Sequence, residues 1–272
     1  MRFTRAAVAT LAAIGLAAAA ATPAAAIRYG EPDDGEHPYV GIMVAFVDGE
    51  PAWRCSGTLV APEVYLTAGH CTYGADSVRV WFDENARSAG TGYPTTGGTV
   101  GTPYSHPQYD DAAFYLHDLG VVKLATAVAM DEYGAITAPG YFDTLFTRRG
   151  PIKESFTAVG YGLQRSMPEQ TGLTEARLER LQATVRIINQ DAMFGEKKAG
   201  NSVLFTNNAA TGGTCSGDSG GPIFIGDSNV IAAVTSYGVN SICAGTGGGY
   251  RIDTADDLAW LATFDVAPVP AG

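Results

Sequence analysis

Short apolar runs separated by turn-forming residues recur along most of the chain. Residues 40–46, 77–82 and 119–124 are apolar or alternate between apolar and polar positions. Glycine, proline, aspartate and asparagine flank them, which is typical of short β-strands. Residues 181–187 alternate with period two and predict another strand, although the residues before them favour a helix. The pattern therefore predicts a fold built mainly of β-strands.

Two stretches depart from this pattern. Near the C-terminus, Asp253 can cap a helix that runs to about Phe264. Leu258 and Leu261 would lie on one face of that helix. Residues 125–150 carry no strong strand pattern, so we interpret them as a connector between two halves of the fold.

Composition agrees with a folded β-protein and excludes several other classes. Of the 272 residues, 46% are hydrophobic, 17% are charged and 34 are glycines. Disordered chains have fewer apolar residues and more charge, and collagen needs a three-residue glycine period that is absent here. The formal net charge of −11 argues against nucleic-acid binding, which calls for basic surfaces.

The first 26 residues have the features of a secretory signal. Arg2 and Arg5 precede an alanine-rich apolar run, and residues 24–26 are all alanine, as at a cleavage site. An uncleaved membrane anchor is the alternative, but the run is short and alanine-rich for a span of about 20 residues. Removal of residues 1–26 takes away two arginines, so the charge of −11 becomes about −13. We expect a secreted protein whose four cysteines form two disulfides, with three pairings open.

A serine in a glycine-rich frame is the first candidate for chemistry. Residues 215–222 read Cys-Ser-Gly-Asp-Ser-Gly-Gly-Pro, with Ser219 at the centre. Glycines permit unusual backbone dihedrals and close approach, which suits an exposed nucleophile with backbone N–H groups aimed at an oxyanion. The same residues match the G-x-S-x-G elbow of esterases and lipases, in which the catalytic histidine follows the serine.

The order of residues along the chain excludes that elbow. The four histidines are His37, His70, His106 and His117, and all of them precede the serine. The order histidine, aspartate, serine remains possible. His70 follows an apolar run and a small-residue turn, and Asp118 opens the apolar run 119–124. An acid at such a boundary can be buried against an imidazole.

Together these motifs resemble the chymotrypsin/trypsin family of secreted serine endopeptidases. The resemblance rests on residues 66–71, 118–124, 217–222, 236–238 and 27–30, in the order that the family has them. It implies an all-β fold of two packed six-stranded antiparallel β-barrels with a C-terminal α-helix. The first barrel would span residues 27–140 with His70 and Asp118, and the second would span residues 141–272 with Ser219.

The resemblance also implies roles for individual residues. Ser219 would be the nucleophile, His70 its general base and later acid, and Asp118 the residue that orients His70. The backbone N–H groups of Gly217 and Ser219 would form the oxyanion hole. The expected activity is peptide-bond hydrolysis through an acyl-enzyme. A non-catalytic binding protein on the same fold is the alternative.

Substrate-binding positions follow from the same resemblance. Residues Ser236, Tyr237 and Gly238 would pair with the substrate backbone as an added strand. Gly213, next to Thr214, stands where trypsin-type enzymes carry an acid, so we expect no preference for basic residues. Gly238 and Gly248 would keep the pocket open. These features predict cleavage after large apolar or aromatic residues.

Two further features of the family concern the cysteines and the N-terminus. The resemblance implies Cys55–Cys71 and Cys215–Cys243 disulfides, although the sequence alone leaves the other pairings open. It also implies that a freed Ile27 ammonium pairs with Asp218, since a buried carboxylate needs a charge partner. Cleavage after Ala26 would itself create that terminus. Cleavage after residues 21–24 with later trimming is the alternative.

The remaining polar residues predict no additional chemistry. Asp110 and Asp111 lack EF-hand spacing, and no histidine or cysteine cluster has zinc spacing along the sequence, so we expect no metal and no cofactor. His37, His106 and His117 are interpreted as structural or exposed. The expected partners are polypeptide substrates and protein inhibitors, without nucleic acid or, once the signal is removed, membrane. We expect a monomer.

Overall fold

The computed structural model describes residues 27–88, 93–164, 178–190 and 201–270, and the expected signal, residues 1–26, lies outside the described residues. The strands are β1 Glu31–Pro32, β2 Val40–Val47, β3 Glu50–Ala61, β4 Val64–Thr67, β5 Ser77–Trp81, β6 Thr99–Ser105, β7 Gly120–Leu124, β8 Ala135–Ile136, β9 Phe156–Gly160, β10 Leu181–Val185, β11 Ile187–Asn189, β12 Ser202–Asn207, β13 Pro222–Ile225, β14 Val230–Gly238 and β15 Gly245–Arg251. The helices are α1 Gly69–Thr72, α2 Tyr141–Thr147, α3 Ala255–Ala262 and the 3₁₀-turn η1 Asp111–Ala113. The all-β prediction is confirmed.

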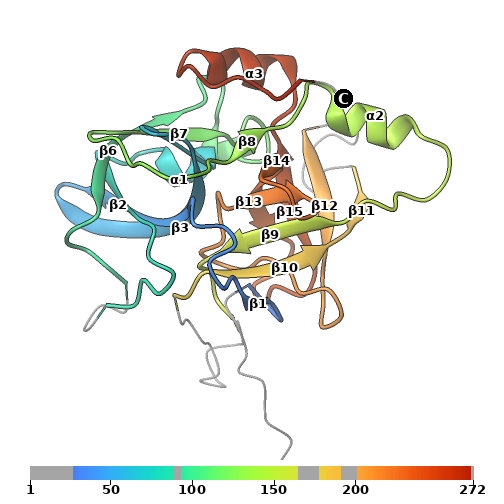
Figure 1. Ribbon diagram of the computed structural model, residues 1–272, viewed down its shortest axis with the longest axis horizontal. Coiled ribbons are helices and arrows are strands. Elements are labelled where there is room, and N and C mark those ends of the chain that lie inside the picture. Colours follow the sequence, from blue (N-terminus) through green and yellow to red (C-terminus); the bar gives the residue numbers. More distant parts are fainter. Residues whose placement is uncertain (1–26, 89–92, 165–177, 191–200, 271–272) are drawn as a thin grey trace, which may run out of the picture.

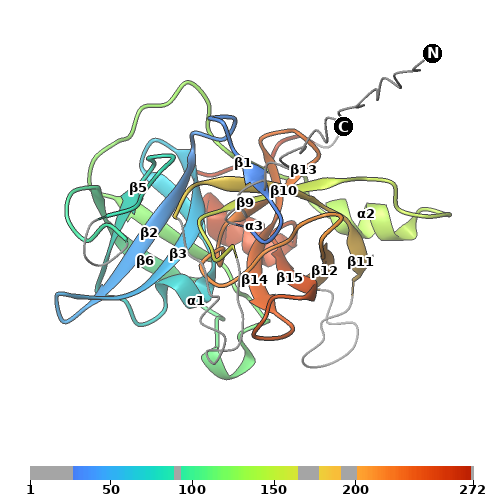
Figure 2. The ribbon, with the colours of Figure 1, turned by 90° about the horizontal axis from the view of Figure 1, so that it is seen from below.

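The first half of the chain forms a closed antiparallel barrel. Its strands are hydrogen-bonded in the order β2-β3-β4-β7-β6-β5. Alternate positions point inward, and the side chains of Ile42, Leu66 and Val121 are fully buried. The barrel occupies one side of the molecule in Figures 1 and 2, in blue, cyan and green. This rigid unit carries α1 and the segment that leads into β7.

The second half forms a nine-stranded sheet rather than a separate six-stranded closed barrel. Its strand order is β1-β10-β9-β13-β14-β15-β12-β11, with β8 pairing in parallel with β14. Strand β10, next to one end of this order, and strand β11, at the other end, are joined by the single residue Arg186, whose backbone bonds with Thr206 of β12. The sheet therefore curls back on itself. The alternating run predicted as one strand is divided between β10 and the edge strand β11.

The C-terminal helix crosses from the second half to the first. Leu258 and Leu261 of α3 lie in the same apolar core as the barrel residues, and Figure 1 shows α3, in red, lying across the end of the fold. The cap differs from the prediction, because the Thr254 side chain accepts the Asp257 N–H. Asp253 instead pairs with Arg251 and accepts the Phe142 N–H.

A buried arginine at the edge of the second sheet bonds to the first barrel. Arg180 is 3% exposed and donates to the carboxylate of Asp33 across 2.7 Å. Its guanidinium also donates to the carbonyl groups of Val40 and Phe82 at the end of the first barrel. Removing Asp33 would leave the buried charge of Arg180 unpaired. The ion pair therefore holds the guanidinium in position for its bonds to the first barrel.

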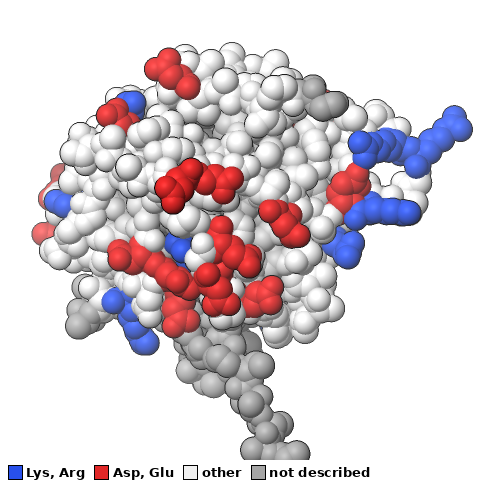
Figure 3. All heavy atoms as spheres, in the orientation of Figure 1, with Lys and Arg blue, Asp and Glu red and all other residues white. Residues whose placement is uncertain are grey.

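Acidic side chains gather on one face of the molecule. Figure 3 shows acidic side chains gathered over the region of β1 and β10. Glu31, Glu36, Glu132 and Asp227 line a single hollow of about 720 Å³ there. Within the described ranges, no helix is both long and apolar enough to cross a membrane.

Candidate active site

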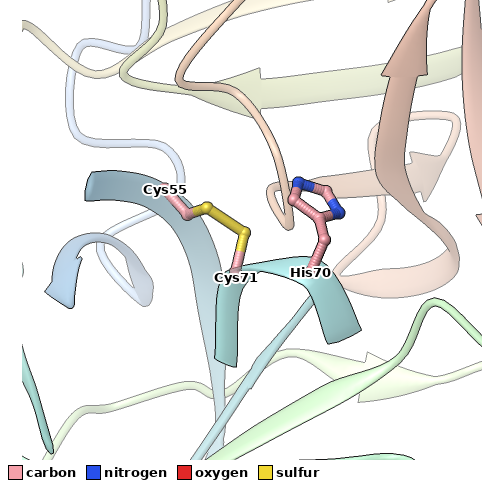
Figure 4. A group of neighbouring side chains, drawn as sticks. All are labelled: Cys55, His70 and Cys71. Atoms are coloured by element: carbon pink, nitrogen blue, oxygen red, sulfur yellow. A yellow bond between two sulfur atoms is a disulfide. The ribbon is translucent and has the colours of Figure 1, made fainter. Parts of the chain in front are cut away.

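His70 lies just after strand β4 in the chain. It belongs to the four-residue helix α1, and the next residue, Cys71, is joined by a disulfide to Cys55 of β3. Figure 4 shows the imidazole projecting from α1 away from the disulfide, towards the strands and loops of the second half. The disulfide therefore fixes the backbone beside the ring.

Asp118 is a fully buried carboxylate at the entrance to β7. Its Oδ1 accepts the backbone N–H of His70 at 2.9 Å, and its Oδ2 lies 2.9 Å from His70 Nδ1. Ser236 of β14 donates its hydroxyl to Oδ2 at 2.5 Å. The carboxylate thus gathers groups from both halves of the fold. With Nδ1 bound to the carboxylate, Nε2 is the nitrogen left for proton transfer.

The protonation of His70 reflects two opposing effects. Burial of the ring favours the neutral form, but the negative charge of Asp118 and its hydrogen bond outweigh burial and hold the pKa of His70 above its ordinary value. A ring with a raised pKa accepts a proton more readily, as a general base must.

Ser219 lies on the turn before β13, packed against the segment that leads to His70. Its carbonyl accepts the Ser56 N–H at 2.8 Å. The adjacent Gly220 has a left-handed backbone with φ 76°, and any side chain there would overlap Thr67 and approach Ala68. Glycine is therefore needed for this close approach. The Ser219 hydroxyl makes no hydrogen bond within the described residues, to His70 or to any other group.

Two backbone N–H groups beside Ser219 are left unused. The Ser216 carbonyl accepts the Leu163 N–H at 2.9 Å. Because a trans peptide points its C=O and N–H in opposite directions, the Gly217 N–H faces away from Leu163. Among the described contacts, neither this N–H nor that of Ser219 has a partner in the protein. The pair is thus available to an oxygen ligand.

Asp218 is buried directly behind this turn. Its carboxylate accepts the N–H groups of Gly162 and Cys215, each at 2.8 Å. Burial raises its pKa to about 7, although these bonds and the nearby charge of Arg54 act in the opposite direction. An added cation beside this carboxylate would stabilise its ionised form.

The N-terminal segment runs beside the same turn. Ile27 is fully buried, and Arg28 pairs with Gly213 through two backbone hydrogen bonds of 2.8 and 3.0 Å. A contact between the Ile27 nitrogen and Asp218 is not among those described. In the chain of 272 residues that nitrogen forms a peptide bond with Ala26, so it is not an ammonium.

A cavity of about 370 Å³ opens next to Ser219. Its described lining is Thr214, Cys215, Ser216, Ser219, Thr235, Ser236, Tyr237, Gly238, Val239, Asn240, Ser241 and Cys243. None of these side chains is charged. The Cys215–Cys243 disulfide joins two of its walls, as the resemblance implies.

Of the glycines predicted to shape the pocket, Gly238 lines the cavity, and Gly213 and Gly248 are not among the described lining residues. A side chain on Gly248 would overlap the ring of Tyr237. Gly247 is the glycine of β15 that faces Thr214. A side chain on Gly213 would overlap Asn207, so the Asn207 amide fills that space.

Sequence reasoning missed three residues that shape the site. Ser56 accepts the Tyr161 N–H and donates to the Gly217 carbonyl at 2.9 Å, which fixes the turn before the nucleophile. Arg54 lies against Gly217, and Asn207 donates to the Thr214 carbonyl at 2.6 Å. Proximity to Cys55 was the one available signal for Ser56 and Arg54, and no sequence motif marks Asn207.

Comparison with known proteins identifies the family of the chain. The sequence model of the trypsin family, described as "Trypsin", matches residues 29–260. The chain belongs to the trypsin family. It is 31% identical over 226 residues to a trypsin of Saccharopolyspora erythraea, covering 79% of this chain and 87% of the relative. It is 29% identical over 229 residues to a chymotrypsin of Phaedon cochleariae, covering 83% and 77%.

Solved structures of this trypsin-family fold are also similar. The HL collagenase matches with a TM-score of 0.66 and 18% identity, over 89% of this chain and 98% of that structure. Human heparin binding protein matches with a TM-score of 0.63 and 18% identity, over 90% and 100%. At such identities these likenesses concern the fold. The predicted family is confirmed.

The first prediction concerns the titration of His70. In protein carrying Ser219→Ala, the NMR midpoint of His70 should lie above the ordinary value of about 6.5. In Asp118→Asn it should fall below that value, because burial then acts without the opposing charge. Asp131→Asn, an exposed change of equal charge, should leave the midpoint unchanged. An unshifted midpoint in Asp118→Asn contradicts the assigned electrostatics.

Proposed function

We propose that this trypsin-family protein is a secreted serine endopeptidase that hydrolyses peptide bonds through an acyl-enzyme. The observation that carries the proposal is the bond from buried Asp118 to His70 Nδ1, which leaves Nε2 facing the half of the fold that holds Ser219. In this role His70 removes the Ser219 proton as the hydroxyl attacks the substrate carbonyl, then donates it to the leaving amine.

The unused N–H groups of Gly217 and Ser219 support the same reaction. As the tetrahedral intermediate forms, negative charge develops on the former carbonyl oxygen. Two fixed donors already oriented by the Leu163–Ser216 bond stabilise that charge without reorganisation. Apo structures often hold catalytic hydrogen bonds open, so the missing Ser219–His70 bond is compatible with a bond formed on substrate binding.

Secretion, polypeptide substrates and inhibition by proteins belong to this proposal. The signal-like segment 1–26 supports export, and the two disulfides suit an oxidising compartment. The uncharged cavity beside Ser219 supports binding of a large apolar or aromatic side chain before the cleaved bond. A basic side chain would lose its hydration there without gaining a counter-charge.

The second prediction tests the nucleophile. Ser219→Ala should lower kcat for a phenylalanyl peptide substrate by about 10⁴-fold or more, because no other group can form the acyl-enzyme. Ser228→Ala is the matched control, since that hydroxyl bonds only within its own surface turn, and its rate should equal that of the parent. Full activity in Ser219→Ala would refute the proposal.

The third prediction concerns specificity. The value of kcat/KM should be at least about tenfold higher for a phenylalanyl than for a matched arginyl peptide ester. Thr214→Asp, which places an acid in the cavity wall, should move the ratio towards the arginyl ester. Faster arginyl hydrolysis by the parent protein would contradict the proposed pocket.

The fourth prediction concerns activation. We propose that cleavage after Ala26 frees the Ile27 ammonium, which pairs with Asp218 and lowers its raised pKa. An alanine added before Ile27 should reduce activity at least about tenfold, because the ammonium is displaced from its partner. Ile27→Val, which keeps an apolar residue and a free ammonium, should retain activity. Unchanged activity of the extended protein would exclude this activation.

A further inference from the structure

A cluster of two histidines and two aspartates lies behind the proposed active site. It consists of His106 from the end of β6, His117 from the residue before Asp118, and Asp256 and Asp257 from the first turn of α3. One nitrogen or carboxylate oxygen from each residue lies within 4.8 Å of all the others. We propose that this histidine–aspartate cluster binds a divalent transition metal ion, with Zn²⁺ as the preferred ion.

The distances suit a tetrahedral ion. His117 Nδ1 lies 3.2 Å from Asp256 Oδ2, and His106 Nε2 lies 3.9 Å from Asp257 Oδ1. Ligands bound to zinc at 2.0–2.2 Å are separated by about 3.3–3.6 Å in a tetrahedron. The four ligand atoms all lie within 4.8 Å of one another, so any two of them need to close by no more than about 1.5 Å to share one ion.

Within the described residues, one nitrogen of the cluster has no hydrogen-bond partner, and one carboxylate is buried without a lysine or arginine beside it. The nitrogen is His117 Nδ1, which is buried and makes no hydrogen bond there, although it lies near Asp256. Asp257 is fully buried, and its hydrogen-bond donors include the hydroxyls of Tyr250 and Thr254. Over the described residues, no lysine or arginine forms an ion pair with either aspartate. A cation held between these groups would compensate the buried carboxylate.

Joint binding of one ion requires the two rings to turn, because an imidazole nitrogen coordinates through a lone pair in the plane of its ring. The imidazoles of His106 and His117 stack with centroids 5.0 Å apart and planes at 10°, and Trp260 packs edge-on against His106. The Gln108 N–H contacts His106 Nδ1 at 3.3 Å, which turns Nε2 towards Asp257. Zinc at Nε2 places the ring proton on Nδ1, so binding must break this long contact.

The donor set selects the class of ion. Imidazole nitrogens with carboxylates suit zinc and other late first-row transition metals, whereas Ca²⁺ and Mg²⁺ take oxygen ligands.

An ion can enter the cluster from solvent, because the side chain of Asp256 is 47% exposed and that of His117 is 19% exposed. Sequence spacing predicts no such site, because its ligands come from three separate segments.

A bound ion would join the two halves of the fold. The histidines belong to the first barrel, and the aspartates belong to the helix that crosses over it in Figure 1. Metal that binds only the folded state raises stability by mass action. The ion would thus fasten α3 to the segment that presents Asp118, without contacting Ser219.

The experiment measures Zn²⁺ binding by titration calorimetry and thermal unfolding of the full protein with Ser219→Ala, after treatment with a chelator. We expect one Zn²⁺ per chain, a Tm that rises with Zn²⁺ and no response to Ca²⁺. His117→Asn and Asp256→Asn should each raise the Kd for Zn²⁺ at least about tenfold. Asparagine tolerates the positive φ of 52° at residue 117, and Asp256 is an exposed position, so both variants should fold.

Asp265→Asn is the matched control, because it makes the same charge change at an exposed position just after α3. Its Kd for Zn²⁺ should equal that of the parent. The absence of any Zn²⁺ effect on the parent would overturn the proposal. Binding that survives both His117→Asn and Asp256→Asn would also overturn it, since the ion would then lie elsewhere. If His117→Asn fails to fold, Asp256→Asn decides the outcome alone.

Discussion

The buried carboxylate of Asp118 is the interaction on which the site depends. A carboxylate removed from water is stable only when several donors surround it, and here the donors come from α1 of the first barrel and from β14 of the second sheet. Satisfying this one charge therefore requires that the two halves meet in a single arrangement. The same arrangement fixes the rotation of His70 and brings the turn that carries Ser219 against the segment before His70.

A second buried carboxylate, that of Asp218, imposes a different constraint. It lies behind the turn that carries Ser219, with two backbone donors and a raised pKa, so its ionisation depends on nearby positive charge. Ser56 and Leu163 bind the carbonyl groups of this turn, and the N–H groups of Gly217 and Ser219 have no partner among the residues that the structure describes. The proposed response to processing at Ile27 follows from this coupling between charge and backbone.

The sequence was sufficient for the parts of the molecule encoded by local pattern. Apolar alternation predicted β2, β5 and β7, and the motifs around His70, Asp118 and Ser219 predicted the family. The sequence was insufficient where the position of a side chain depends on packing against residues far away in the chain. Thr254 rather than Asp253 caps α3, because Asp253 forms an ion pair with Arg251. Asn207, at the end of β12, fills the space beside Gly213. The histidine–aspartate cluster escaped prediction for the same reason.

The central claim is that Asp118 and His70 make Ser219 a nucleophile. The most direct measurement exposes the purified protein, with Ile27 as its N-terminus, to a serine-reactive aryl phosphonate with a phenylalanine-like side chain. Mass spectrometry then locates the adduct. We expect one phosphonyl group per chain on Ser219, formed much more slowly in Asp118→Asn and absent in Ser219→Ala. No adduct on the parent protein, or an adduct on a different residue, would contradict it.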